Sequence, residues 1–539
     1  MKKAIFSISF IFVFLLTFAQ TNQERADAII KEALPNNEHG VAVLVARDGE
    51  ILYEKYTGYA NVKKQTAVEA NTTFRIGSVT KQFTAAAILK LVEQDKMQLD
   101  NPLNKYIEDF PRGDKITIHH LLNHTSGIKS YTDQPDFIKS VAKSVATKEL
   151  VDEIKSLGFD FEPGEQWKYN NSAYYILGYL IEQESGMSYE AFLKKHFFEP
   201  AGMENTGVYD KTKKYKMEAL GYANEEGKVK LSMDWDMTRA GGAGNMYSTV
   251  TDLLKWNNFV FSGKVVRADL LAKAHTQLTL NDGSNYPYGY GWGVGDFRGL
   301  DQIAHSGGLH GFLTWLAYYP EIDVTVAVTS NASPPLKIVP GQLGKDMMEV
   351  FFEDQLESRE EAEIDAEELQ KYVGKYEYPG GAIMTVTQEE GKLFAELTGQ
   401  QRFQLFSEGE NKFFWKVVDA QIEFHVADNG EVDYGMHSQG GMEMKVPKIE
   451  EQEAITMTPK EFKKFEGEYV LNGASVKVWE ESGSFYTQIQ GQPRFEIHPK
   501  SDYRFFMKEL AVEIEFAEGD KPESFTLYQV GREVVAKRK

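Results

Sequence analysis

An internal repeat near the C-terminal end is the feature that most constrains how this chain can fold. Residues 382–403 match residues 474–495 at a constant offset of 92 positions, with shared glycines and a shared Arg-Phe pair. Each copy holds about 80 to 90 residues of short alternating strands with turn residues between them, the pattern of a small antiparallel β-barrel. Two copies are too few for a solenoid, and each is large enough to fold alone, so the chain must contain several domains.

The repeat leaves room for a larger domain before it. At 539 residues the chain is too long for one hydrophobic core. An acidic segment at residues 354–368, interpreted as a solvated helix or a linker, precedes the repeat. We therefore expect a domain of mixed helices and strands at residues 22–357, followed by two barrels at residues 365–450 and 457–539.

Local patterns indicate the elements of the larger domain. Residues 41–46 and 51–56 are apolar-rich runs joined by Asp48-Gly49, a pair typical of a tight hairpin turn. Two buried strands are expected at residues 313–319 and 324–329. Helices are expected at residues 78–93, 119–123 and 174–184.

The N-terminal segment predicts export. Two lysines precede an apolar run at residues 4–18, with small residues at Thr17 and Ala19. This pattern indicates a signal peptide at residues 1–19 and a periplasmic or secreted protein, the alternative being an uncleaved anchor. No second apolar run is long enough to span a membrane, and the lack of cysteine excludes disulfides and a lipid-modified cysteine.

The charge balance limits the partners. A formal net charge of −21 argues against nucleic acids and anionic membranes, because both would be repelled. A small-molecule or short-peptide substrate is compatible with this charge, which does not by itself identify a substrate. The sequence leaves the oligomeric state open, a homo-oligomer included.

A Ser-x-x-Lys motif at Ser78 and Lys81 carries the strongest chemical signal. It lies where an extended stretch gives way to an alanine-rich helix, so the hydroxyl and the amine share one helical face. A serine becomes a good nucleophile when a neighbouring base removes its proton, which Lys81 can do if its pKa falls from about 10.4. The alternative is an N-capping serine followed by a surface lysine. The same spacing recurs at Ser126/Lys129 and Ser140/Lys143.

Two further motifs follow in the chain. Tyr169-Asn170-Asn171 precedes a helical pattern, and its phenol, with an ordinary pKa of about 10, offers a second base. Either Lys81 or this tyrosine could take the serine proton, and the other could return it. The third motif, residues 305–308, reads His-Ser-Gly-Gly and could be only a strand entry with a glycine turn. Each motif is weak alone, but three in this order at element boundaries jointly favour catalysis.

Together the motifs resemble the serine β-lactamase and penicillin-binding-protein-like hydrolases, of the class C and D-aminopeptidase type. The resemblance covers residues 25 to 350 and extends to residues 116–128, 241–256, 288–292 and 311–331. It implies an α+β fold in which helices flank an antiparallel sheet. It also implies catalysis without a metal or an organic cofactor.

The resemblance assigns roles to seven residues around one cleft. Three would be catalytic, with Ser78 as the acylated nucleophile and Lys81 and Tyr169 as the acid/base pair. The others would bind substrate: Asn171 at the substrate amide, His305 and Gly307 along the strand that lines the cleft, and the N–H of Gly308 beside that of Ser78 in the oxyanion hole.

Two positions depart from the family pattern. Asn170 stands where the family often has serine, and His305 stands where true β-lactamases and carboxypeptidases usually carry lysine. A histidine with a pKa near 6.5 is mostly neutral at about pH 7, which disfavours β-lactams and peptides with a free D-alanine carboxylate. The pattern looks more like the D-aminopeptidases and esterases of the family. We therefore expect D-aminopeptidase-like cleavage of short peptides first, and carboxylesterase or β-lactamase/DD-carboxypeptidase activity second.

Other classes of function compete with this interpretation. A metallohydrolase would use His119, His120 and His124, although no H-E-x-x-H arrangement accompanies them. A binding or sensor protein could keep the fold without turnover. The barrels, which are rich in aromatic residues, could bind lipids or glycans, although most of these side chains are expected in the barrel cores.

Overall fold

The chain folds into two compact units, each described separately below. The computed structural model describes residues 20–34, 38–225, 228–333, 339–379, 381–450, 452–471, 473–529 and 532–539, and the expected signal peptide at residues 1–19 lies outside them. The first unit comprises residues up to 294 together with 299–356, and the second comprises 295–298 together with 357–539. Within the described ranges, no helix is both long enough and apolar enough to cross a membrane.

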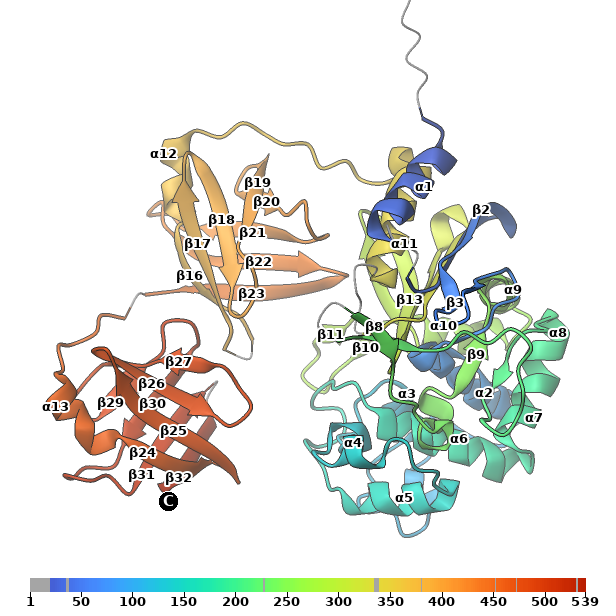
Figure 1. Cartoon of the computed structure of the whole chain (residues 1–539), viewed down its shortest axis with the longest axis horizontal. Coiled ribbons are helices and arrows are strands. Elements are labelled where there is room, and N and C mark those ends of the chain that lie inside the picture. Colours follow the sequence, from blue (N-terminus) through green and yellow to red (C-terminus); the bar gives the residue numbers. More distant parts are fainter. Residues whose placement is uncertain are drawn as a thin grey trace, which may run out of the picture. The chain divides into compact units, whose positions relative to one another are not determined.

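An antiparallel sheet forms the centre of the first unit (Figure 1). The expected hairpin is present as β1 (Val41–Arg47) and β2 (Glu50–Thr57), and both turn residues, Asp48 and Gly49, have the positive φ that a tight two-residue turn needs. The strand order is β12-β13-β14-β15-β1-β2. The other four strands are β12 (Gly293–Phe297), β13 (Leu300–Leu309), β14 (Phe312–Tyr319) and β15 (Val324–Ser330).

Helices cover both faces of this sheet. On β15, Thr325 accepts a hydrogen bond from Asn257 of α9 (Val250–Phe261), whereas the next residue, Val326, packs against Gly344 of α11 (Pro340–Phe352). Successive strand residues point to opposite faces, so α9 and α11 lie on opposite sides of the sheet. Such burial on both faces explains why every residue of β15 is apolar or small.

Two buried helices form the rest of the framework around the motifs. Helix α2 (Thr80–Glu93) follows the short strand β5 (Phe74–Arg75) and a 3-10 turn (Gly77–Val79), and helix α6 (Asn171–Ser185) begins just after its cap, Asn170. Gly178 of α6 lies so close to Gly242 that a Cβ on Gly178 would stand 3.0 Å from the Gly242 nitrogen. This close approach brings the turn at residues 241–243 against helices α2 and α6. The α+β prediction for this part of the chain is confirmed.

The acidic segment at residues 354–368 is mainly a connection. Its regular structure is confined to a 3-10 turn (Glu353–Gln355) and the start of α12 (Ala366–Leu369). Of the two interpretations, a solvated helix or a linker, the structure agrees with the linker, because the exposed glutamates give a helix no apolar face to bury.

Two antiparallel barrels make up most of the second unit (Figure 1). The first is closed, in strand order β16 to β23. Its strands are β16 (Gly374–Glu377), β17 (Ile383–Glu389), β18 (Lys392–Leu397), β19 (Phe403–Gly409), β20 (Lys412–Phe414), β21 (Gln421–Val426), β22 (Val432–Gln439) and β23 (Met442–Ile449).

The second barrel is a nine-stranded sheet that curls until its edges nearly meet. Its order is β27-β26-β25-β24-β32-β31-β30-β29-β28, so the two edge strands follow each other in the chain. The strands are β24 (Gly467–Leu471), β25 (Ala474–Glu481), β26 (Ser484–Ile489), β27 (Arg494–Glu496), β28 (His498–Pro499), β29 (Arg504–Phe506), β30 (Val512–Phe516), β31 (Ser524–Gln529) and β32 (Arg532–Arg538).

The sequence repeat reappears as repeated contacts. In the first barrel the hydroxyl of Tyr376 donates to the carbonyl of Tyr372 at 2.8 Å, and in the second Tyr469 donates to the carbonyl of Phe465 at the same distance. Each barrel also opens with a short helix, α12 in the first and α13 (Pro459–Phe462) in the second. The repeat therefore encodes one structural unit used twice.

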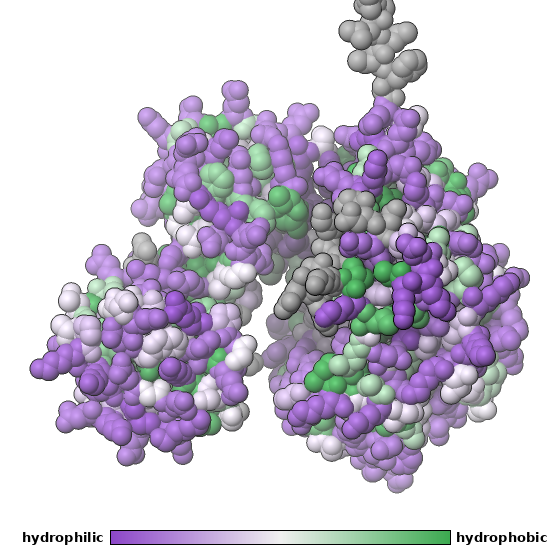
Figure 2. All heavy atoms as spheres, viewed as in Figure 1, coloured by the Kyte–Doolittle hydropathy of each residue, from purple (hydrophilic) through white to green (hydrophobic). Residues whose placement is uncertain are grey.

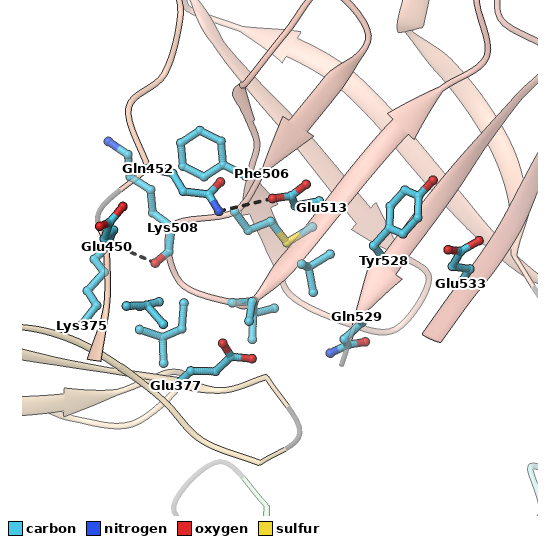
Figure 3. Close-up of a pocket in the computed structure, with 16 residues that line it drawn as sticks. Lys375, Glu377, Glu450, Gln452, Phe506, Lys508, Glu513, Tyr528, Gln529 and Glu533 are labelled. Carbon is cyan, nitrogen blue, oxygen red and sulfur yellow. Dashed lines mark hydrogen bonds between the residues drawn. The ribbon is translucent and has the colours of Figure 1, made fainter. Parts of the chain in front are cut away.

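The surfaces of both units are predominantly hydrophilic in the face that Figure 2 shows. A cavity of about 400 Å³ lies within the second unit, where the two barrels adjoin (Figure 3). The barrels are joined there by the backbone N–H of Ala511, which donates to Gly381, and by Lys375, which donates to the carbonyl of Lys508. All of its lining residues lie between 375 and 533, so none of the predicted site residues contributes to it.

Candidate active site

Lys81 is completely buried, and its amine touches three oxygen atoms. Nζ lies 3.2 Å from Oγ of Ser78, 2.8 Å from Oδ1 of Asn171 and 2.8 Å from the carbonyl oxygen of Ala243. Burial lowers the pKa of Lys81 well below its usual range. A neutral amine has two hydrogens and one lone pair. If Asn171 and Ala243 accept the two hydrogens, the lone pair is left for the Ser78 hydroxyl.

Ser78 sits in the 3-10 turn just before α2 and is half-buried, so its hydroxyl stays within reach of a substrate. Asn171 is held in one orientation, because its side-chain nitrogen donates to the hydroxyl of Thr132 at 3.0 Å while its oxygen faces Lys81. The Tyr-Asn-Asn motif thus meets the Ser-x-x-Lys motif through an amide of fixed direction. Asn170 caps α6 by accepting from the amide of Ala173, and it also donates to the carbonyl of Ile128.

Tyr169 completes this cluster from the loop before α6. Its ring centroid lies 4.7 Å from Nζ of Lys81. The hydroxyl oxygen is buried and makes no hydrogen bond of ordinary geometry to the described part of the chain. Burial raises the pKa of Tyr169, and the nearby Ser78 hydroxyl opposes that rise only in part. In this state the phenol keeps its proton and is available as a donor.

Glycines bring the third motif against the first. A Cβ on Gly307 would stand 1.9 Å from the carbonyl oxygen of Ile76 and 3.1 Å from the amide nitrogen of Ser78. A Cβ on Gly77 would stand 2.8 Å from the amide nitrogen of Gly308. Only glycine permits this approach of β13 to the turn before α2. It places the amide nitrogens of Ser78 and Gly308 on the two segments that meet at Ser78.

His305 lies on β13 and is 6% exposed. Its Nε2 is 2.9 Å from the hydroxyl of Tyr288, and its Nδ1 is 2.6 Å from the carbonyl oxygen of Ser306. Burial lowers the pKa of His305 to about 3; the nearby Lys81 lowers it further when its amine is protonated, and the bond to Ser306 opposes the shift. The third motif therefore presents an uncharged ring at neutral pH.

The three histidines of the metallohydrolase alternative do not converge. His119 pairs with the hydroxyl of Tyr290 at 2.7 Å, while His120 accepts from the amide of Thr117 as part of the cap of α3 (Ile118–Leu122). His124 lies elsewhere, in contact with Tyr288. No cluster of three or more metal-ligating side chains exists among the residues that the structure describes.

Several contributors to the site were not predicted. The carbonyl of Ala243 is a backbone atom, and no side-chain motif marks it. Thr132 orients Asn171, and Tyr288 contacts His305. Gly291 lets the Tyr288 segment approach α2, since a Cβ there would lie 2.6 Å from the Lys81 carbonyl. The glycines at 241–244 and at 289–293 were a usable signal, because clustered glycines mark close backbone approach.

Comparisons with known proteins agree with this geometry. Residues 26–343 match the Beta-lactamase family, and residues 358–447 match a domain of unknown function, DUF3471. The chain is 27% identical over 448 residues to penicillin-binding protein 4* of Bacillus subtilis (strain 168), an alignment covering 79% of this chain and 99% of that protein.

Solved structures show the same fold. The octameric penicillin-binding protein homologue from Pyrococcus abyssi is 26% identical, with a TM-score of 0.56 over 79% of this chain and 99% of that one. A D-amino acid amidase from Ochrobactrum anthropi SV3 is 23% identical, with a TM-score of 0.55 over 62% of this chain and 99% of that one. The predicted family resemblance is confirmed, and so is the fold with two C-terminal barrels.

Proposed function

Since this chain belongs to the Beta-lactamase family and is a serine hydrolase, we propose that it cleaves an amide or ester bond through an acyl-Ser78 intermediate. The observation that carries the proposal is the buried amine of Lys81, 3.2 Å from the Ser78 hydroxyl. A neutral amine at that distance can accept the serine proton as the oxygen attacks the substrate carbonyl.

The proton then has a defined route. Lys81 takes the proton from Ser78, and the carbonyl carbon becomes tetrahedral with its oxygen negatively charged. Tyr169, whose raised pKa keeps it protonated, donates to the leaving nitrogen or oxygen as that bond breaks. Lys81 can return its proton to the Tyr169 oxygen, since the centroid of that ring lies 4.7 Å from Nζ. Water then hydrolyses the acyl-serine by the reverse sequence.

The amide groups of Ser78 and Gly308 are the proposed oxyanion hole. The close packing of Gly77 against Gly308 supports this, because it brings the two backbone segments together at the nucleophile. Losing one such donor costs about 3 kcal/mol of transition-state stabilisation. Asn171 would contact the substrate amide while it continues to accept from Lys81.

The favoured substrates are short peptides with an N-terminal D-amino acid. His305 is uncharged at neutral pH, so the third motif supplies no cation for a substrate carboxylate. That property favours a D-aminopeptidase-like enzyme. Carboxylic esters are the second candidate class. Acylation by β-lactams is a third, favoured by the similarity to penicillin-binding proteins.

The N-terminal pattern indicates the cellular location, and we propose that the protein is periplasmic or secreted. The Pyrococcus abyssi homologue is octameric, which makes a homo-oligomer a reasonable state to test by light scattering.

The substrate class is tested with three chromogenic compounds: a D-alanine anilide, a short acyl ester and a cephalosporin. The proposal expects turnover of the anilide above the other two, with turnover abolished in Ser78→Ala. Preference for the ester or the cephalosporin would reassign the substrate, while activity that survives in Ser78→Ala would overturn the acyl-serine assignment.

A further inference from the structure

A continuous row of hydrogen bonds runs behind the third motif. The amide N–H of Asn170 lies 3.2 Å from Nδ1 of His124, and Nε2 of His124 lies 3.2 Å from the Tyr288 hydroxyl. That hydroxyl is 2.9 Å from Nε2 of His305, whose Nδ1 is 2.6 Å from the Ser306 carbonyl. The row thus links the second motif to the third through two histidines and one tyrosine.

The two ends of the row determine the tautomers of both histidines. A backbone N–H can only donate, so Nδ1 of His124 is an acceptor and its hydrogen is on Nε2. A carbonyl oxygen can only accept, so Nδ1 of His305 carries the hydrogen. The Tyr288 oxygen therefore receives a hydrogen from His124 and donates its own to Nε2 of His305. In this arrangement each group is satisfied with both rings neutral.

Protonation of His305 would break this order. A hydrogen on its Nε2 would place a second donor against the Tyr288 oxygen, and the Tyr288 hydroxyl would have to turn from His305 to the neighbouring Tyr174 oxygen. The groups around the ring offer no compensating anion: Lys81 is a base whose protonated form would repel a charged ring, while Tyr169, Tyr174, Tyr288 and His124 are uncharged. A buried charge without a partner anion is unfavourable, and the other neutral tautomer would set the Nδ1 lone pair against the Ser306 carbonyl, so the row resists a change of tautomer or charge.

We propose that Tyr288 and His124 are positioning residues that hold His305 in one neutral tautomer, with its hydrogen on Nδ1. The uncharged ring then makes this side of the site select against substrates with a carboxylate beside the scissile bond. The selectivity part rests on the proposed function. The tautomer part does not, because it concerns the free protein.

The contrast with a lysine at the same position explains the expected selectivity. A lysine would present a hydrogen-bonding cation, whereas both nitrogens of His305 are already engaged by Tyr288 and Ser306. The ring has neither a charge nor a free donor to offer a carboxylate. A carboxylate brought there would lose its hydration without gaining a partner.

The tautomer is tested on the full-length protein labelled with ¹⁵N-histidine, by recording imidazole N–H signals between about pH 5 and pH 8. His305→Gln and His124→Gln identify the two signals among the 11 histidines. We expect a pH-insensitive Nδ1–H signal from His305 and a pH-insensitive Nε2–H signal from His124. Titration of His305 in this range, or an Nε2–H tautomer, would refute the proposal whatever the enzyme's activity.

Tyr288→Phe tests the positioning role, and Tyr290→Phe is its matched control. Tyr290 belongs to the same segment, is equally buried and also pairs with a histidine, His119. Tyr288→Phe should make His305 titrate or change tautomer, whereas the control should leave its signal unchanged. Both proteins should retain the circular dichroism spectrum of the parent.

Selectivity is read as the ratio of kcat/KM for a D-alanine anilide to that for the same anilide bearing a ring carboxylate. At about pH 5, Tyr288→Phe should lower this ratio about tenfold, the effect of one unit of histidine pKa. An unchanged ratio with an altered His305 signal would overturn the selectivity role. An unchanged His305 signal in Tyr288→Phe would overturn the positioning role as well. If neither anilide is turned over by the parent, the substrate assignment fails, and the N–H signals alone decide the tautomer.

Discussion

Two buried basic side chains of the candidate site, Lys81 and His305, lie near each other but have different surroundings. Both lose their positive charge through burial, at 0% and 6% exposure. The amine of Lys81 has the Ser78 hydroxyl among its three partners, so its lone pair can reach a proton that the reaction must move. The nitrogens of His305 are both occupied by Tyr288 and Ser306.

The difference teaches that a shifted pKa does not by itself assign a catalytic role. Burial makes both groups neutral bases, yet the hydrogen-bond partners leave only Lys81 in a position to act on the nucleophile. Side chains with shifted pKa values at a site therefore fall into two classes: those that transfer protons and those that determine which substrates fit. The predictions below test this division.

Replacing Lys81 should have the largest effect. Lys81→Met removes the proposed base while keeping an unbranched side chain in the buried space, and kcat should fall by about 10³-fold or more with KM little changed. Lys143→Met is the matched control, since Lys143 has the same spacing from a serine but is exposed. Loss of less than about tenfold in Lys81→Met would place the base elsewhere.

Tyr169→Phe should have the next largest effect. The ring remains but the buried hydroxyl is lost, so donation to the leaving group should weaken and kcat should fall by about 10²-fold. The loss should be greater for an anilide than for an ester with a nitrophenol leaving group, which departs without a proton. Equal losses for the two substrates would contradict the donor role.

His305→Lys should produce a smaller and selective effect. A lysine would break the row at Tyr288 and bring a cation to the cleft, so kcat/KM for the carboxylated anilide should rise about tenfold relative to the neutral one. The measurement is the ratio of the two rates in the folded variant. A ratio equal to that of the parent would show that this position does not determine charge selectivity.

The pH dependence of activity should show the ionisation of Lys81 but not that of His305. Activity should rise with pH as Lys81 loses its proton, at a midpoint well below the usual lysine value of about 10.4. His305, with a pKa of about 3, should add no step at higher pH. A step near about pH 6.5 that disappears in His305→Gln would contradict the comparison.

The sequence predicted what depends on local pattern. The hairpin around Asp48-Gly49 and the helical run that opens with the 3-10 turn at Ser78 and continues as α2 follow from turn chemistry and periodicity, and the two barrels follow from the repeat. Contacts between distant segments were harder to foresee. The carbonyl of Ala243 reaches Lys81 because Gly178 and Gly242 pack closely, and no residue type at 243 announces that.

The protonation state of His305, in the third motif, also depends on contacts between distant segments. From the sequence, His305 was expected to be mostly neutral because of its ordinary pKa alone. The structure gives a stronger reason, since burial and the row through Tyr288 both oppose the charge. That row joins residues separated by 17 and 164 positions in the chain, a relation that no single motif contains.

The most direct test of the central claim is mass spectrometry of the protein quenched during turnover of a slowly deacylating ester, followed by peptide mapping. We predict one added acyl group, on the peptide containing Ser78, which is absent in Ser78→Ala and accumulates less in Lys81→Met. Turnover without any acyl adduct, or an adduct on another residue that persists in Ser78→Ala, would contradict the account.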